Sequence, residues 1–232
     1  MPFYDREDKI LNILKSENSL TLGELAKRLY VSLPTVRRDL IKLDKKGLVV
    51  RSHGSVSIKR TAADTKIPFA LREDERSEEK DRMARRAAAL VKNGDTVMLD
   101  GSTSAYHIIP YLAEKKDIIV ITSGAKAALL LAELGIQTVS SGGKMINRSF
   151  SYVGEDANAT ISRYNADIAF FSCRGLSDDK IPSDNSAEEN EVRRTMMRNS
   201  QRRILLCDSK KLGRVFLNNL CRPDEIDEII TE

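Results

Sequence analysis

The stretch SLPTVRRDL, residues 32–40, places a proline and two adjacent arginines at the start of a predicted helix. Ser32 is a suitable N-cap for a helix over residues 33–46, because its hydroxyl can accept a backbone N–H that has no partner inside the helix. Pro34 fits the first turn, where its missing N–H costs no hydrogen bond. The question is then whether the arginines face solvent or a polyanion.

The predicted helix divides into an apolar face and a basic face. At 100° per residue, Val36, Leu40 and Leu43 share one side, which predicts packing against other helices. The opposite side carries Pro34, Thr35, Arg38, Lys42 and Lys45, with Arg37 on its flank. A helix that enters the major groove needs this division, since one face anchors it while the other contacts base edges. A solvated basic face produces the same pattern, so the flanking sequence has to decide between the two.

The flanking sequence predicts a winged helix-turn-helix domain over residues 3–58, with the helix-turn-helix itself at 20–39. An apolar stripe predicts a helix at 6–16. A second helix is expected to start in a capping box, in which Thr21 is followed three residues later by Glu24.

A hairpin is predicted directly after the basic helix. Gly47 is placed to end that helix, and two β-prone arms, 48–52 and 55–58, follow about a turn at His53-Gly54. Basic side chains on and after the hairpin are placed to contact phosphate or the minor groove: Arg51, His53, Lys59 and Arg60. The hairpin and the capped helix favour DNA binding over a solvated face.

The positive charge of the chain is concentrated in its first quarter. Residues 1–60 hold 13 Lys and Arg against 7 Asp and Glu, a net charge of +6, whereas residues 61–232 have a net charge of −2. A basic head suits a polyanionic partner, here double-stranded DNA.

The first domain resembles the N-terminal domain of DeoR-type bacterial transcription regulators. The matching motifs are E-L-A at 24–26, V-S at 31–32, T-V-R-R-D-L at 35–40 and R-x-H-G at 51–54. Ser55 stands where the family has a second glycine. The resemblance implies that Thr35, Arg37 and Arg38 contact DNA and that Asp39 holds the arginines in place. The expected DNA-binding residues are Thr21, Ser32, Pro34, Thr35, Arg37, Arg38, Lys42, Arg51 and His53.

The rest of the chain predicts a linker and a larger α/β domain. Residues 59–75 are polar and charged, whereas residues 76–232 alternate strands with helices. Strands are expected at 96–100, 118–122, 138–140, 168–172, 204–208 and 228–230, and helices near 77–92, 103–113, 125–134, 155–163 and 187–200. The continuous β-branched character of the strands is typical of a parallel sheet covered on both faces. This domain is expected to sense an effector and to form oligomers.

Glycines, hydroxyls and lysines follow four of the predicted strands. In a parallel sheet these corners share one edge, where ligands bind at the switch point, and N–H groups at helix starts favour an anion. Each corner alone also fits ordinary helix capping, but four together favour a small phosphorylated ligand. The expected effector-binding residues are Asp100, Gly101, Ser102, Thr103, Thr122, Ser123, Gly142, Gly143, Lys144 and Lys210.

The sequence contains neither G-x-x-x-x-G-K-[ST] nor G-x-G-x-x-G, so a sugar phosphate is a better candidate than a nucleotide. The DeoR-type resemblance continues across this domain and implies a fold similar to ribose-5-phosphate isomerase. Two positions depart from the family pattern, because Asp100 directly precedes Gly101 and Ser123 stands where asparagine is usual. The matching segments are Gly94-Asp95, Gly101-Ser102-Thr103, Gly142-Gly143 and Asp208-Ser209-Lys210.

Two functions fit these features. The first is a sequence-specific transcriptional regulator, a repressor of a carbohydrate-metabolism operon that is controlled by a sugar phosphate. It would act as a homo-oligomer, a dimer or a tetramer, since one small head makes too few DNA contacts. The alternative is a sugar-phosphate isomerase-like enzyme fused to a DNA-binding head, with Asp100, Asp184 or Glu188 as general base. The glycine-rich lysine segment of the isomerases is not recognisable, so we expect no enzyme and no catalytic residues.

Metal, cofactor and membrane functions find little support in the sequence. Cys173, Cys207 and Cys221 have no C-x-x-C spacing, and the two histidines, His53 and His107, are too few for a usual metal centre. No apolar run approaches the roughly 20 residues that cross a bilayer, and the charged N-terminus does not resemble a secretory signal. We therefore expect a cytoplasmic protein with reduced thiols and no cofactor.

Overall fold

Two compact units, residues 1–67 and 68–232, make up the computed structural model. The residues that the structure describes are 3–16, 20–45, 48–52, 55–58, 69–75 and 77–232. Four sequence-based assignments lie outside the described residues, namely those for Gly47, the turn at His53-Gly54, Lys59 and Arg60.

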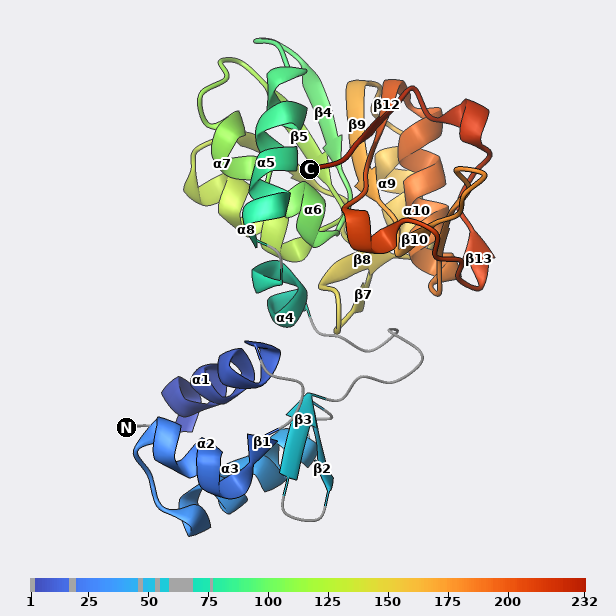
Figure 1. Ribbon diagram of the computed structural model, residues 1–232. Helices are drawn as coiled ribbons and strands as arrows, with labels where there is room; N and C mark the ends of the chain where they lie inside the picture. Colours follow the sequence, from blue (N-terminus) through green and yellow to red (C-terminus); the bar gives the residue numbers. More distant parts are fainter. Residues whose placement is uncertain (1–2, 17–19, 46–47, 53–54, 59–68, 76) are drawn as a thin grey trace. The chain divides into compact units, whose positions relative to one another are not determined.

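The small unit is a winged helix-turn-helix domain (Figure 1). Its elements are α1 (Phe3–Ser16), β1 (Leu20–Thr21), α2 (Leu22–Leu29), α3 (Leu33–Lys45), β2 (Val49–Ser52) and β3 (Ser55–Ile58). The strands pair antiparallel in the order β1-β3-β2. The three helices and the hairpin confirm the prediction. Strand β1 was not predicted, because two residues carry no recognisable alternation.

Local hydrogen bonds fix both ends of the turn between α2 and α3. The predicted capping box is confirmed, since the Glu24 N–H donates to Thr21 Oγ1 at 3.2 Å and the Thr21 N–H donates to Glu24 Oε2 at 2.9 Å. Helix α2 ends at Tyr30, whose left-handed φ of 53° redirects the chain. The Val36 N–H then donates to the Ser32 carbonyl at 3.1 Å, which places Ser32 at the start of α3 as expected.

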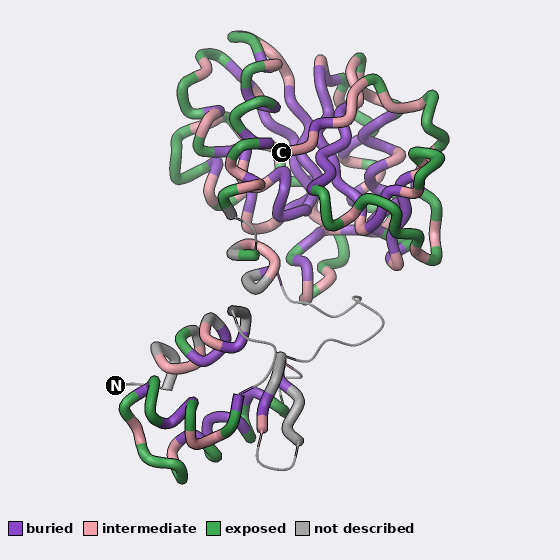
Figure 2. The backbone as a smooth tube through the Cα atoms, in the orientation of Figure 1, coloured by how far each residue is buried: buried purple, intermediate pink, exposed green. Residues whose placement is uncertain are grey.

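Helix α3 packs through one face. Val36, Leu40 and Leu43 are fully buried, as predicted, together with Leu25 of α2 and Ile10 of α1. Figure 2 shows the resulting alternation of buried and exposed segments along α3. The opposite face of α3 is therefore left available for a partner.

Asp39 does not hold the arginines of α3, and that expectation is wrong. Its carboxylate is buried and pairs with Arg6 of α1, with 2.8 Å between Arg6 Nε and Asp39 Oδ2. A second hydrogen bond runs from Arg6 Nη2 to Asp39 Oδ1 at 3.3 Å. Asp39 lies three residues after Val36 and four before Leu43, so it shares their buried face. It attaches α3 to α1.

The large unit contains a six-stranded parallel sheet with helices on both faces (Figure 1). The strand order is β14-β12-β9-β4-β5-β6, and every neighbouring pair is parallel. The strands are β4 (Thr96–Leu99), β5 (Ile119–Thr122), β6 (Gln137–Ser140), β9 (Ala166–Ser172), β12 (Ser200–Leu206) and β14 (Glu228–Ile230). They match the six predicted strands and confirm the α/β prediction.

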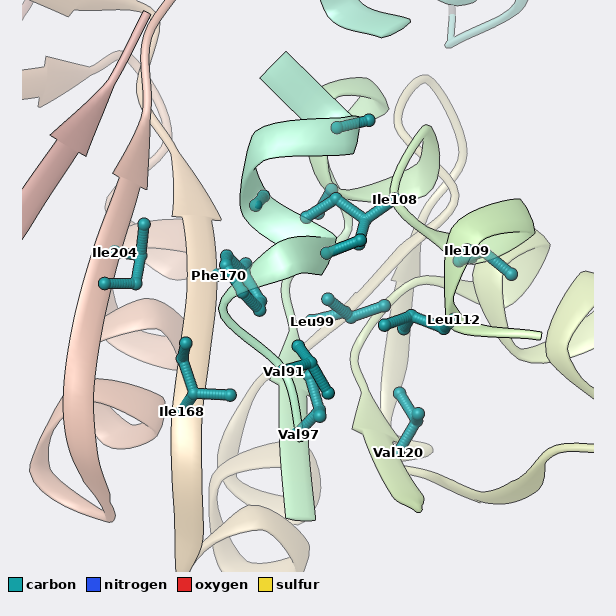
Figure 3. Packing of buried hydrophobic residues seen from close by; sticks show 14 of the residues in the cluster. Val91, Val97, Leu99, Ile108, Ile109, Leu112, Val120, Ile168, Phe170 and Ile204 are labelled. Atoms are coloured by element: carbon teal, nitrogen blue, oxygen red, sulfur yellow. The ribbon is translucent and has the colours of Figure 1, made fainter. Parts of the chain in front are cut away.

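Two apolar clusters cover the two faces of the sheet. Val97 and Leu99 of β4 point towards α5, α6, α7 and α8, where Phe170 and Ile108 also lie (Figure 3). Met98, the residue between them, points to the other face and packs with α9 and α10. This alternation is the two-residue period of a strand. The covering helices are α5 (Ser77–Ala89), α6 (Thr103–Tyr106), α7 (Ile109–Leu112), α8 (Ala125–Glu133), α9 (Glu155–Ile161) and α10 (Ala187–Arg198).

Several elements differ from the prediction. The helix expected near 103–113 is split into α6 and α7, because Pro110 has no N–H to continue a helix and lies in the first turn of α7. Helix α4 (Phe69–Asp74) lies within residues expected to be linker. Short strands and turns that carry no period of their own also escaped prediction: β7 (Lys144–Ile146), β8 (Ser151–Val153), β10 (Gly175–Leu176), β11 (Pro182–Asp184), β13 (Asn218–Asn219), η2 (Ser209–Lys211) and η3 (Pro223–Glu225).

The structure also bears on thiols, metals and membranes. Cys173, Cys207 and Cys221 are unpaired, and the first two are buried. Across the described part of the chain, no group of His, Cys, Asp and Glu side chains has the arrangement of a metal site. None of the helices in those residues is long and apolar enough to span a bilayer.

Gly101 is required by close packing at the end of β4. A Cβ at this position would lie 2.2 Å from Ser151 Oγ and 2.9 Å from Ser151 Cβ, so an alanine would push β8 away from β4. We expect Gly101→Ala to lower the free energy of unfolding of the large unit by about 1–3 kcal/mol, measured by urea denaturation. Gly23→Ala, whose Cβ would meet no atom closer than 3.9 Å, is the control. Equal effects of the two substitutions would contradict the packing argument.

Candidate DNA-binding surface and effector site

The exposed face of α3 carries the cationic side chains that the sequence assigns to DNA. Arg37, Arg38 and Lys42 are exposed, as is Pro34 in the first turn. Within the described residues neither arginine has an ion-pair partner. Their guanidinium groups are therefore available for hydrogen bonds to base edges, where arginine pairs best with guanine O6 and N7.

Exposed apolar side chains lie close to these arginines, and the sequence analysis did not select them. Tyr30 is 95% exposed, Leu33 43% and Ile41 42%. Ile41 follows Arg37 by four residues and Arg38 by three, so the helical wheel already places it on the same face. Apolar side chains in the major groove contact the methyl group of thymine. The surface therefore combines groups suited to guanine with groups suited to thymine.

The other predicted DNA-binding residues have mixed positions. Thr21 is exposed but its hydroxyl takes part in the capping box, and the hydroxyls of Ser32 and Thr35 lie 2.9 Å apart. Arg51 belongs to β2, and His53 lies outside the described residues. Contact of these residues with DNA stays a prediction.

The strand order of the large unit creates a topological switch point between β4 and β9. From β4 the chain adds β5 and β6 on one side and then returns to place β9 on the other, with Val97 opposite Ile168. Ligands of open parallel sheets bind outside the carboxyl ends of the strands at such a point. Residues 100–104 and 172–174, which follow the two strands, surround this position.

Asp100 ties the switch point to α10. Its carboxylate accepts hydrogen bonds from the N–H groups of Ser102 and Ser172, at 3.1 and 3.2 Å, and from Arg193 Nε at 2.8 Å. Both Asp100 and Arg193 are buried. With its oxygens engaged in this way, Asp100 shapes the site and is poorly placed to act as a base.

Arg193 extends the ion pair to Asp184, 3.0 Å away. Burial lowers the pKa of Arg193, but the carboxylates of Asp184 and Asp100 outweigh it and raise the pKa above its usual value. Burial likewise raises the pKa of Asp184, and the charges of Arg193 and Arg174 outweigh it and hold the pKa below its usual value. A paired, ionised carboxylate of this kind is a weak general base, which leaves the isomerase alternative without support from Asp184.

Lys211 faces the switch point, whereas Lys210 does not. Lys211 Nζ donates to Ser172 Oγ at 2.9 Å and lies 3.4 Å from Ser104 Oγ. Lys210, the lysine chosen from the sequence, is exposed and forms a surface ion pair. The 3-10 turn η2 directs the two side chains differently, and adjacent identical residues give no sequence signal of that difference. The predicted Ser102 and Thr103 lie on the same corner as Ser104.

Lys80 of α5 adds a second cation beside Lys211. Its side chain is buried, and its ammonium group donates to the backbone carbonyls of Arg72 and Glu75 at the end of α4. Burial, followed by the charge of Lys211, lowers the pKa of Lys80 to about 8. Nothing in the sequence pattern separates Lys80 from the other charged residues of its helix, so it was missed.

The corner after β5 is filled by β8. Thr122 and Ser123 are buried, and the Tyr152 N–H donates to the Ser123 carbonyl at 2.7 Å. The cavity lined by Gly101, Ser123 and Ser151 has a volume of about 10 Å³, which is close to that of one water molecule by the same measure. A sugar phosphate does not fit there.

The corner after β6 lies apart from the switch point. A Cβ on Gly143 would lie 2.8 Å from the Val153 carbonyl oxygen, so this glycine is needed for packing, and Gly142 also has a positive φ of 61°. Lys144 pairs with Glu188 at 2.9 Å and lines a separate hollow of about 460 Å³. Because β6 lies four strand positions from β12, the two strand ends are about 19 Å apart. One small ligand does not contact both ends.

A winged helix-turn-helix domain joined to an α/β unit with cations at its switch point defines a DNA-binding protein that responds to a small-molecule effector. Residues 6–62 match the DeoR-like helix-turn-helix domain, and residues 75–232 match the DeoR C terminal sensor domain. The chain therefore belongs to the DeoR family of helix-turn-helix transcriptional regulators. It is a regulator and not an enzyme.

Curated relatives match over almost the full chain. The uncharacterized HTH-type transcriptional regulator YulB of Bacillus subtilis (strain 168) is 32% identical over 230 residues, which are 98% of this chain and 88% of that protein. The HTH-type transcriptional repressor GlcR of the same organism is 32% identical over 224 residues, 96% of this chain and 86% of that protein. The glycerol-3-phosphate regulon repressor of Escherichia coli (strain K12) is 25% identical over 228 residues, which are 98% of this chain and 90% of that protein.

Solved structures match at the level of the fold. The translation initiation factor eIF-2B of Pyrococcus horikoshii OT3 has a TM-score of 0.51 and 16% identity, covering 97% of this chain and 86% of that one. The delta subunit of eIF2B from Chaetomium thermophilum also has a TM-score of 0.51, at 17% identity over 70% of this chain, which spans 58% of that protein. Ribose 5-phosphate isomerase A of Methanocaldococcus jannaschii has a TM-score of 0.45 at 19% identity, covering 59% of this chain and 54% of that one.

The lowered pKa of Lys80 predicts a pH dependence of anion binding. With a pKa of about 8, Lys80 is positive below that pH and loses its charge as the pH rises through it. A phosphate monoester keeps its charge over this interval, because its second pKa is about 6. We expect the affinity for a bound phosphate monoester to fall from about pH 7 to about pH 9.5, measured by titration calorimetry. Lys80→Met should flatten the profile, and constant affinity in the unmodified protein would contradict the assignment.

Proposed function

We propose that this protein represses a carbohydrate-metabolism operon and that a sugar phosphate bound in the large unit controls its DNA binding. The observation that carries the effector half is the position of Lys211, whose ammonium contacts the hydroxyls of Ser172 and Ser104 at the switch point. The ammonium also pairs with Asp208 at 3.2 Å, and an ammonium provides charge-assisted hydrogen bonds for a phosphate group. The buried Lys80 adds a second positive charge next to it.

The hydroxyl-rich corner after β4 supports a sugar phosphate in particular. Ser102, Thr103 and Ser104 follow β4 and are buried or nearly so. Hydroxyl groups both donate and accept, which suits the hydroxyls of a sugar. The helix that starts here, α6, is only four residues long, so the lysines, and not a helix dipole, supply the positive charge.

The names of two relatives support repression as the direction of control. GlcR is named a transcriptional repressor, and the E. coli relative is named for the glycerol-3-phosphate regulon that it represses. We extend repression to this chain on that basis.

Helix α3 is proposed to enter the major groove of the operator. Arg38 and Pro34 lie on its most exposed side, and Arg37 flanks them. One such head makes few base contacts, so two heads on adjacent half-sites, and hence a dimer or a tetramer, are proposed to give genomic selectivity. The effector weakens or strengthens operator binding only as far as it prefers one of the two arrangements of the heads.

Removing a guanidinium from α3 tests the DNA half of the proposal. An operator is first selected from a random duplex pool with the full chain, and affinity is then measured by fluorescence anisotropy at fixed salt. We expect Arg38→Ala to weaken binding roughly 5- to 150-fold, the value of one bidentate base contact of about 1–3 kcal/mol. Lys9→Ala, on the exposed side of α1, removes the same charge and should have little effect. If the two variants bind equally well, α3 is not the recognition helix.

The adjacent lysines of η2 provide a matched test of the effector half. The full chain is screened by thermal shift against a panel of sugar phosphates, since a ligand that binds the folded state raises its apparent stability. We expect Lys211→Gln to remove the stabilisation and Lys210→Gln to preserve most of it, because only the former ammonium contacts Ser172. A panel without any stabilising compound, or equal loss in both variants, would count against this effector site.

A further inference from the structure

Helix α4 is the first element of the large unit and is attached beside the switch point. The Phe69 N–H donates to the Arg148 carbonyl at 2.8 Å, and the Phe69 ring meets Tyr106 of α6 edge to face at 5.5 Å between centroids. The Lys126 ammonium of α8 lies 4.7 Å from the centre of the Phe69 ring and pairs with Glu73 at 3.1 Å. Helix α4 therefore contacts the helices that follow β4 and β5.

The carboxyl end of α4 is held by Lys80 of the effector site and by Lys210, which lies outside that site. Lys80 donates to the carbonyls of Arg72 and Glu75, and Lys210 pairs with the Glu75 carboxylate at 2.9 Å. Lys210 is the neighbour of Lys211 in η2. A ligand at the site that moves Lys80 therefore acts directly on the end of α4.

Among the described residues, Arg72 of α4 has a buried donor without a hydrogen-bond partner, namely its Nε. Burial, followed by the positive charge of Arg174, lowers the pKa of Arg72 to about 10, while Glu189 and Asp184 act in the opposite direction. Buried polar groups in native proteins are nearly always paired, so an unpaired one needs an explanation such as an absent ion.

The neighbouring cations are already matched by protein groups. Arg193 pairs with Asp100 and Asp184, and Arg174 lies 3.5 Å from Asp184. Arg72 adjoins the effector site, because the ammonium of Lys80 donates to the Arg72 carbonyl. An anion at the switch point would supply the acceptor that Arg72 lacks.

We propose that Arg72 donates from Nε to the anionic group of the effector and that α4 thereby relays effector occupancy to residues 59–68 and the DNA-binding unit. The inference rests on the proposed function, since it takes a phosphate-bearing ligand at the switch point as given. In the sequence, residues 59–68 join β3 to α4, so α4 is the sensor helix nearest to the head along the chain. A six-residue helix is marginal without external contacts, and its position therefore depends on what it binds.

The relay follows from differential binding. Without ligand, the unmatched Nε disfavours the observed position of α4, and with an anion present the same position gains a charge-assisted hydrogen bond. A ligand shifts an equilibrium by the difference in its affinity for the two states. Because of Arg72, the observed position of α4 is more favourable in the protein with a bound anion than in the protein without one.

The test compares Arg72→Met with Arg82→Met in the full chain, using inorganic phosphate as the probe. Arg82 lies on the exposed side of α5 and serves as the control for loss of one charge. Melting temperature is followed during phosphate titration, and amide hydrogen exchange of residues 69–74 is measured with and without phosphate. Arg72→Lys, which keeps the charge but loses Nε, is the second variant in case the methionine disturbs folding.

In the unmodified protein and in Arg82→Met, phosphate should raise the melting temperature and slow exchange in 69–74. Arg72→Met should melt higher than the unmodified protein without phosphate, because an unmatched buried donor is gone, and should need roughly tenfold more phosphate for the same shift. Arg72→Lys should also lose the slowed exchange. A lower melting temperature of Arg72→Met with unchanged phosphate response would make Arg72 a purely structural residue and overturn the inference.

The experiment separates this inference from the function on which it rests. If phosphate stabilises the unmodified protein and Arg82→Met but Arg72→Met responds equally, the effector site stands and the role of Arg72 falls. If phosphate slows no exchange in 69–74 of the unmodified protein while still stabilising it, the relay through α4 falls. If neither phosphate nor any sugar phosphate stabilises the unmodified protein, the proposed effector function itself fails.

Discussion

The carboxylate of Asp100 is the interaction on which the sensor unit depends. It accepts from the backbone after β4, from the backbone after β9 and from Arg193 of α10, and so it joins three segments that are distant in the sequence. The two strands are neighbours at the centre of the sheet, and Asp100 links their carboxyl ends to α10. A buried ion pair gains little stability over apolar packing, but losing one partner leaves an uncompensated charge. Its value here is that it fixes the carboxyl ends of β4 and β9 at the proposed effector site.

Arginine is used in three different ways in this chain. On α3, Arg37 and Arg38 are exposed, and their guanidinium groups are available to a partner outside the protein. In the sensor, Arg193 is buried and matched by two carboxylates. Arg72 is intermediate, because its Nε is buried and unmatched within the described residues. The first and third are the positions at which an external anion changes the energy of the molecule most, and they correspond to the two proposed binding events.

Sequence patterns predicted the elements far better than the roles of individual residues. The six predicted runs became the six strands, and the central strands β4, β5 and β9 have the continuous apolar signature of strands buried on both faces. The capping box of Thr21 and Glu24 was likewise visible, since it depends on residues three apart. By contrast, the orientation of Lys210 and Lys211 is decided by the geometry of η2, which is not encoded in residue type.

The same limit explains the other departures from expectation. A count along the helical wheel puts Asp39 on the apolar face. The family resemblance implied a contact with the neighbouring arginines, whereas the structure pairs Asp39 with Arg6. The crowding around Gly101 and Gly143 comes from β8, a three-residue strand without a pattern of its own. The effector residues expected after β5 and β6 lie on the same edge of the sheet as the end of β4, as predicted. However, β8 fills the corner after β5, and the strand order places the corner after β6 too far from β12 for one small ligand.

The register of the central strand pair has a consequence for the order of folding. Val97 of β4 pairs with Ile168 of β9, 71 residues later, whereas the farthest strand pairing in the small unit joins Leu20 to Val56, 36 residues apart. Folding rates fall as the sequence separation of native contacts grows. A newly made chain therefore completes its small unit before its large unit, which is also the order in which the two are synthesised.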